Sequence, residues 1–222
     1  MKTAHLTFNA SGAAEGAKRG DIVVIVDIID MSTSAEVAIE SGAVAIFGAA
    51  PSHCKVPVRI DPEGMGYLAG KTALELKTQL IVVAEPRYGG EEERKSRAGA
   101  ALSGVVRAGG EILHIVPNIG SEIAKLADFK DKVALFVSDT GGVAYDAAYQ
   151  SGAPSVLTAT VTRTPQKKGM EPARTGIERA VEHARKFNCG VTITAASSNS
   201  MEDVLAGQYL LQLLINSGFL NL

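Results

Sequence analysis

Short uninterrupted runs of apolar residues recur along the chain and alternate with longer amphipathic stretches. An apolar run without polar alternation is typical of a strand that is buried on both faces of a sheet. The amphipathic stretches have the length of helices. The runs predict strands over residues 22–26, 44–47, 80–84, 112–116, 133–137, 155–159 and 191–195. The amphipathic stretches predict helices over residues 34–41, 89–108, 144–151, 172–187 and 201–217.

This alternation of strands and helices indicates the α/β class. Helices have to cover both faces of a fully buried sheet, so we expect a three-layer α/β/α architecture with a mostly parallel or mixed central sheet. The length of 222 residues fits one large domain, and residues 1–222 are therefore predicted to form a single α/β domain.

Two segments of the chain match each other without a gap. VVIVDIIDMSTSAEVAIESGAVAIFGA begins at Val23, and VALFVSDTGGVAYDAAYQSGAPSVLTA begins at Val133. Each predicts a strand, a small polar loop, a helix, Ser-Gly-Ala and a second strand, with Gly42 or Gly152 closing the helix. The match indicates a two-fold pseudo-repeat, or else only the pattern that many strand–helix–strand units share.

Two stretches are rich in turn-forming residues and are expected to be loops. Residues 53–70 contain Pro57, Pro62 and the sequence DPEGMG, whereas residues 163–172 (RTPQKKGMEP) are basic and flanked by prolines. The second stretch is either a mobile flap or oligomer contact, or a solvated surface connection.

Composition then narrows the class of protein. With 46% hydrophobic and 21% charged residues the chain is globular, and a net charge of −2 gives no electrostatic basis for binding nucleic acid. No apolar run reaches the ~20 residues of a membrane span, and the N-terminus lacks the apolar core of a signal peptide. Cys54 and Cys189 belong to no CxxC pair. We therefore expect a reduced cytoplasmic protein without a membrane or nucleic-acid partner.

Three predicted loops that lead from a strand into a helix carry small polar residues. Helix N-termini present unpaired N–H groups and attract anions, and such loops gather at the carboxyl ends of parallel strands. The alternative is that the hydroxyl and acidic side chains only cap their helices. The loops comprise Asp30, Met31, Ser32, Thr33 and Ser34; Ser138, Asp139, Thr140, Gly141 and Gly142; and Ser197, Ser198, Asn199 and Ser200.

Acidic residues flank these loops. Asp27 ends an apolar strand, where a buried carboxylate is costly, and Asp30 follows three residues later. A strand-end acid commonly holds Mg²⁺ through oxygen ligands. Glu85 and Arg87, directly after another predicted strand, could supply a metal ligand and a clamp for a phosphate or carboxylate. The alternative is that Asp30 caps a helix and that Glu85 and Arg87 form an exposed pair.

Several common catalytic motifs are missing. The chain has no GxGxxG fingerprint, no GxxxxGK[ST] loop and no GxSxG elbow. The histidines are scattered without the spacing of metal ligands. Dinucleotide binding, P-loop hydrolysis and hydrolysis by an elbow serine thus lose support.

The order of the remaining motifs resembles the 2-phosphosulfolactate phosphatase (ComB-like) family. The chain carries VVIVDIIDMSTSAEVAIESGA from Val23, AEPRYGG from Ala84, KVALFVSDTGGVAYDAA from Lys132 and VTITAASSNSMEDVLAGQYLL from Val191. The family's corresponding motifs are a DVLRATTT-type loop with a helix ending in NGA, a GERxG segment, a KTLVLTTTNGTRA block, and a strand with Cys-Ala-Gly before an acidic helix. The likeness covers nearly the whole chain in the same order.

The resemblance implies a Mg²⁺-dependent phosphatase acting on a small phosphorylated 2-hydroxy acid such as 2-phosphosulfolactate, in an α/β/α fold. It carries over Asp27 as the strand-end acid, and further positions in the loops and the last helix. These further positions are Thr33, Ser34, Glu85, Arg87, Gly141, Glu202 and Asp203.

Two departures from the family pattern remove cations. Asp30 stands where the first loop of the family has Arg, and Thr140-Gly141-Gly142-Val143 replaces Asn-Gly-Thr-Arg. Either the phosphoryl site is rebuilt with Arg87 and Mg²⁺, or the scaffold is a small-molecule binding or regulatory module. A third hypothesis is an oligomeric structural protein that associates through its apolar C-terminal helix, although that helix could equally belong to the core.

The hypothesis carried forward is a Mg²⁺-dependent phosphatase with a small anionic substrate, and its candidate assembly is a homodimer. Its predicted catalytic residues are Asp27, Asp30, Glu85 and Arg87, and its predicted metal ligands are Asp27 and Glu85. Its predicted substrate-binding residues are Ser32, Thr33, Ser34, Asp139, Thr140, Gly141, Gly142, Ser198 and Asn199.

Overall fold

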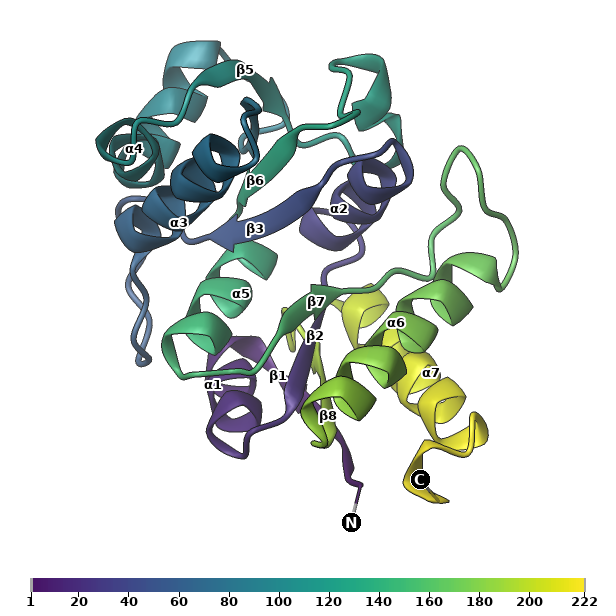
Figure 1. Cartoon of the computed structure of the whole chain (residues 1–222). Helices are drawn as coiled ribbons and strands as arrows, with labels where there is room; N and C mark the ends of the chain where they lie inside the picture. The colour runs from purple at the N-terminus through teal and green to yellow at the C-terminus, as the bar shows by residue number, and fades with distance from the viewer. Residues whose placement is uncertain (1, 222) are drawn as a thin grey trace.

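A computed structural model describes residues 2–221 and places the strands in two four-stranded sheets (Figure 1). Every strand pairing is parallel. Sheet A has the order β1-β8-β2-β7, and sheet B has the order β3-β6-β4-β5. The strands are β1 (Ala4–Phe8), β2 (Ile22–Val26), β3 (Ala45–Ala49), β4 (Leu80–Ala84), β5 (Ile112–Pro117), β6 (Val133–Val137), β7 (Val156–Thr158) and β8 (Val191–Ala195).

Helices separate most of these strands along the chain. The α-helices are α1 (Asn9–Lys18), α2 (Met31–Glu40), α3 (Pro62–Glu75), α4 (Glu91–Arg107), α5 (Gly141–Gln150), α6 (Glu171–Phe187) and α7 (Met201–Asn216). Two 3₁₀ helices are η1 (Gly120–Lys125) and η2 (Phe219–Asn221). Within residues 2–221, none of the helices combines the length and the apolar character that crossing a membrane requires.

The uninterrupted apolar runs form the interior strands of the sheets. All residues of β2, β4, β6 and β8 are buried, and these strands occupy the two central positions of sheets A and B. Burial on both faces explains why their sequences show no alternation of polar and apolar residues. The expected strand at each of these places is confirmed.

Helices cover both faces of each sheet, which confirms the three-layer α/β/α class. The residues Ile22 and Val24 of sheet A pack with α6 and α7, whereas Val23 and Ile25 face the cluster that includes Ala13 of α1. Helices α3 and α4 cover one face of sheet B. Helices α2 and α5 contact strands of both sheets and therefore lie between them (Figure 1). The strands thus form two sheets that share a layer of helices.

The chain passes between the two sheets twice, and each passage is one of the two matching sequence segments. One passage is β2–α2–β3 and the other is β6–α5–β7. The helices have equal lengths of 10 residues. Each ends before a glycine in the left-handed region, Gly42 with φ of +92° and Gly152 with φ of +86°. Such a residue turns the chain out of a helix with little steric cost only when it lacks a Cβ.

Part of the predicted loop over residues 53–70 is wrong, because α3 begins at Pro62. The side chain of Asp61 accepts a hydrogen bond of 2.8 Å from the Gly64 N–H, and Pro62 occupies the first turn. Asp-Pro-Glu is therefore a helix start here, since proline needs no hydrogen-bond partner in the first turn. The elements β1 and α1 were also absent from the predicted set.

The apolar C-terminal helix belongs to the core of this chain. Leu210 and Leu214 of α7 are completely buried and join the cluster on the outer face of sheet A. Leu205 and Ile215 remain 56% and 40% exposed. The helix thus covers the sheet, as expected if it belongs to the core.

Helices α3 and α4 cross at a distance that only glycine permits. A Cβ added to Gly66 would lie 1.9 Å from the carbonyl oxygen of Ala101, and one added to Gly104 would lie 1.9 Å from that of Glu63. Because backbone atoms form these contacts, a side-chain rotation cannot relieve them. A Cβ at Gly99 of the same helix would meet only the Ser52 hydroxyl, at 3.5 Å.

We predict that Gly104→Ala destabilises the protein by about 3 kcal/mol, because the helices must separate to admit the methyl group. Gly99→Ala serves as the matched control and should stabilise the protein by up to about 1 kcal/mol through helix propensity. Urea denaturation followed by circular dichroism measures both values. Equal effects of the two substitutions would contradict the close crossing.

Candidate functional site

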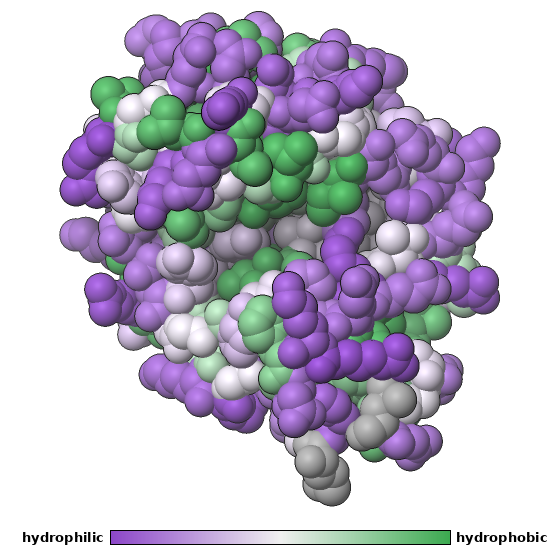
Figure 2. Space-filling view, viewed as in Figure 1, coloured by the Kyte–Doolittle hydropathy of each residue, from purple (hydrophilic) through white to green (hydrophobic). Residues whose placement is uncertain are grey.

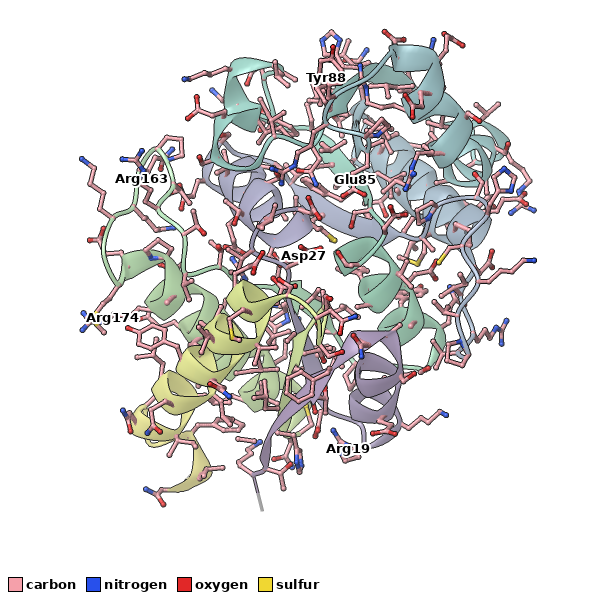
Figure 3. All side chains as sticks on the ribbon, turned by 180° about the vertical axis from the view of Figure 1, so that it is seen from behind. Arg19, Asp27, Glu85, Tyr88, Arg163 and Arg174 are labelled. Atoms are coloured by element: carbon pink, nitrogen blue, oxygen red, sulfur yellow. The ribbon has the colours of Figure 1, made fainter. Side chains whose placement is uncertain are left out.

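Loops from the carboxyl ends of the two sheets meet near the middle of the molecule. Figure 3 shows Asp27 close to the centre, with Glu85 near it. Asp27 follows β2 of sheet A, and Glu85 follows β4 of sheet B. The carboxyl ends of parallel strands are the usual place for a ligand in open α/β sheets. The two sheets contribute such ends to the same place.

Asp27 connects sheet A to the first turn of α5. Its Oδ2 accepts hydrogen bonds from the Thr140 hydroxyl at 2.8 Å and from the Gly141 N–H at 2.6 Å. Its Oδ1 accepts a third from the Asp30 N–H at 3.2 Å. Asp27 is 2% exposed, and burial and then the charge of Asp30 raise the pKa of its carboxyl, which the three hydrogen bonds oppose. The carboxylate thus occupies the anion-attracting end of α5.

The carboxyl group of Glu85 lies in surroundings that disfavour its charged form. Its Oε2 accepts a hydrogen bond of 3.2 Å from the Asp139 N–H, whereas its Oε1 is buried without a hydrogen-bond partner. Burial and then the nearby charge of Asp30 raise the pKa of Glu85 from an ordinary 4.5 to about 8. At neutral pH this side chain is therefore mostly a neutral carboxylic acid.

Two Asp–Arg ion pairs flank Glu85. Asp30 pairs with Arg87 at 2.9 Å, and Asp139 pairs with Arg97 of α4. The Nε atom of Arg97 is buried without a hydrogen-bond partner. The same holds for Arg94, whose Nη1 donates to the Gly89 carbonyl oxygen at 2.9 Å. The first turns of α4 thus bring guanidinium groups to the loop of Glu85.

The hydroxyl residues at the start of α2 donate hydrogen bonds to oxygens of neighbouring segments of the protein. Ser32 donates to the carbonyl oxygen of Ile25 at 2.8 Å, and Thr33 donates to that of Ile28 at 2.6 Å. Ser34 donates to the side-chain oxygen of Asn118, which follows β5. All three are buried. In this arrangement they brace the loops around Asp27.

The N–H groups at the start of α5 are likewise engaged within the protein. Gly141 donates to Asp27, and Gly142 donates to the Ser138 hydroxyl at 2.8 Å. A Cβ on Gly141 would lie 2.4 Å from the Asp27 Oδ2, so this position requires glycine while Asp27 sits there. Thr140 supplies its hydroxyl to the same carboxylate.

The segment after β8 contacts the loop of Asp27 through Asp203, whereas the predicted residues Ser198 and Asn199 make other contacts. Ser198 exchanges hydrogen bonds with Asn9, at the junction of β1 and α1. The Asn199 N–H donates to Ser197 at 3.2 Å. Asp203, in the first turn of α7, accepts a hydrogen bond of 2.8 Å from the Ile28 N–H. Burial, above all, raises its pKa to about 6, with a contribution from Asp27.

Among the acidic groups of the site, Glu85 has a buried carboxyl oxygen without a hydrogen-bond partner. Within residues 2–221 no three Asp, Glu, His or Cys side chains are arranged as a metal site. Both oxygens of Asp27 already accept hydrogen bonds, and Asp30 and Asp139 each pair with an arginine. The unpartnered Glu85 Oε1 would become a carboxylate oxygen of the kind that Mg²⁺ uses once the side chain loses its proton, and water and substrate would have to supply the other ligands.

The structure adds cations that were not among the predicted site residues. Arg94 and Arg97 lie three residues apart, so both occupy one face of α4 near its start. That spacing is visible in EEERKSRAG, but nothing local in the sequence shows that Asp139 lies opposite Arg97.

Comparison of the chain with models of known protein families and with curated proteins gave no match.

The raised pKa of Glu85 predicts a pH dependence of stability. Between pH 4.5 and about 8 the folded chain retains a proton that the unfolded chain has lost. Folding therefore takes up a proton, and the free energy of unfolding falls as pH rises through this window, by up to about 1.4 kcal/mol per pH unit. The contribution is fully present below pH 4.5 and is lost above pH 8.

Urea denaturation between pH 6.5 and 8 in the presence of EDTA tests this dependence. We expect Glu85→Gln to show a shallower fall in stability than the wild type, because an amide has no proton to lose. Glu92→Gln, which changes an exposed glutamate of α4, should retain the wild-type slope. Identical slopes for all three proteins would contradict the raised pKa.

Proposed function

We propose that the protein is a Mg²⁺-dependent phosphatase that acts on a small phosphorylated 2-hydroxy acid such as 2-phosphosulfolactate. The observation that carries the proposal is the buried Glu85 Oε1, which has no hydrogen-bond partner and lies between two Asp–Arg pairs. The order of motifs that resembles the 2-phosphosulfolactate phosphatase family supports it.

The charges of the site support a cation and an anion binding together. Arg87 and Arg97 are each neutralised by an aspartate. Within residues 2–221, Asp27 and Glu85 make no ion pair. A divalent cation here would balance Asp27 and Glu85 in their ionised forms, so its binding would displace the proton that Glu85 retains near neutral pH. A phosphate dianion would then use the remaining donors of the arginines.

Each residue has a proposed role. Ionised Glu85 would hold Mg²⁺, and the cation would supply Lewis-acid polarisation of the phosphoryl group. Asp27 fixes the start of α5 against sheet A and adds negative charge beside the cation. Arg87 and Arg97 bind phosphoryl oxygens and stabilise the charge that develops on them. Asp30 and Asp139 orient the two arginines. A cytoplasmic location and a homodimer belong to the same proposal.

A specific observation favours a second function, that of a small-molecule binding or regulatory module. Asp27 fills the N-terminus of α5, where the motif order would place a phosphate-binding loop. A protein side chain that occupies an anion site excludes a dianion from it by repulsion. Such a scaffold would bind a ligand without turning it over.

Phosphate release from a panel of phosphorylated 2-hydroxy acids, with and without Mg²⁺, tests the proposed activity. We expect Asp27→Asn and Glu85→Gln to lower the Mg²⁺-dependent rate by at least about 100-fold, because each removes charge at the cation. Glu92→Gln should retain the wild-type rate. Thermal unfolding of each variant shows whether a loss of activity follows from a loss of folding.

The outcomes separate the two functions. A wild-type protein that releases no phosphate from any member of the panel contradicts the phosphatase. Stabilisation of that inactive protein by one of the same compounds, measured as a rise in the thermal midpoint, would favour the binding module instead. Activity that is equal in the presence of EDTA would contradict the role of Mg²⁺.

A further inference from the structure

A small cavity with basic walls lies between η1 and the loop after β7. It has a volume of about 260 Å³. Its charged groups are Lys125, Arg163, Lys168 and Glu122, and the hydroxyl residue Ser121 also lines it. Three cations against one acid leave the lining with a formal charge of +2. Figure 3 shows Arg163 on its loop, apart from Glu85.

The two walls of this cavity are fixed by contacts elsewhere. Ser34 of α2 donates to the Gly120 carbonyl oxygen at 3.3 Å, and Ile123 of η1 is completely buried. In the opposite loop, the Thr164 N–H donates to the Lys167 carbonyl oxygen at 3.0 Å, which closes a turn. Lys167 pairs with Glu40 of α2 at 3.1 Å. Both walls thus contact α2, which holds the two segments of the chain that line the cavity next to each other.

The ion pairs around the cavity leave two of its cations free. Lys125 pairs with Glu122, and Lys167, outside the lining, pairs with Glu40. Among residues 2–221, Arg163 and Lys168 pair with no acid. Like charges that converge on one cavity repel each other, and a bound anion removes that repulsion. Arginine adds a planar fork of donors that matches the oxygens of a phosphate group.

From these features we infer that the cavity is a binding site for a small anion with two or more negative charges, of the inorganic phosphate, pyrophosphate or phosphomonoester class. The volume lies just below the usual range of ligand pockets, which begins near about 300 Å³, and so fits a small anion. This site is separate from the proposed phosphatase site and does not require that activity.

Isothermal titration calorimetry at low ionic strength tests the inference, with pyrophosphate, inorganic phosphate and glycerol 3-phosphate as separate probes. We expect binding of pyrophosphate to the wild type and at least about a tenfold loss of affinity in the double variant Arg163→Ala/Lys168→Ala. The charge-preserving double variant Arg163→Lys/Lys168→Arg should retain most of the affinity. Comparison of the three probes distinguishes an inorganic anion from a phosphomonoester.

Matched controls separate this cavity from other positive charges. Lys55→Ala/Arg59→Ala removes one exposed lysine and one exposed arginine from the loop before α3 and should leave binding unchanged. Repeating the titration in an Arg87→Ala background removes the contribution of the proposed phosphatase site, and the loss caused by Arg163→Ala/Lys168→Ala should persist in that background.

Three results would overturn the inference: no binding of pyrophosphate to the wild type, equal losses in the two alanine double variants, or a loss confined to Arg87→Ala. Tighter binding of a single-stranded oligonucleotide than of pyrophosphate would identify a nucleic-acid surface instead.

Discussion

The contact between the Asp27 carboxylate and the start of α5 joins the two halves of the protein. Asp27 ends a strand of sheet A, and α5 leaves a strand of sheet B. A helix terminus offers partial positive charge and unpaired N–H groups, so a buried carboxylate is stabilised there better than in an apolar interior. This contact ties the carboxyl end of β2 to the helix that follows β6, and it requires glycine at position 141.

Several acidic side chains meet at this site, but most of their negative charge is neutralised. Two aspartates are paired with arginines, and Glu85 retains a proton near neutral pH. The cations come from the loop after β4 and from the first turns of α4. Arg94 and Arg97 therefore place positive charge beside the acidic loops of the candidate site.

The sequence predicted the fully buried strands well, because an apolar run such as that of β2 has no other stable environment. The positions of Asp27 and Glu85 directly after such strands predicted that both lie at the carboxyl ends of the sheets, where the candidate site is. The segment of α3 was misjudged because Asp61 and Pro62 favour both turns and helix starts. The strand β1 is only half-buried and Ala- and Gly-rich α1 shows little amphipathic contrast, so neither element was predicted.

The division into two sheets and the pairing of Asp139 with Arg97 could not be predicted from local pattern. Both depend on which strands become neighbours, and strand order is a property of the whole chain. Parallel strands add to this difficulty, because their partners are always distant in sequence. For the same reason the convergence of Asp27 and Gly141, 114 residues apart, required the structure.

The order of the strands also bears on how the chain folds during its synthesis. All strands of sheet B lie in one continuous stretch, from β3 to β6, whereas β1 pairs only with β8. A ribosome therefore releases every strand of sheet B before the strand that completes sheet A. Throughout that interval the N-terminal strand lacks its partner and exposes an unpaired edge, which is the state most open to wrong association or to a chaperone.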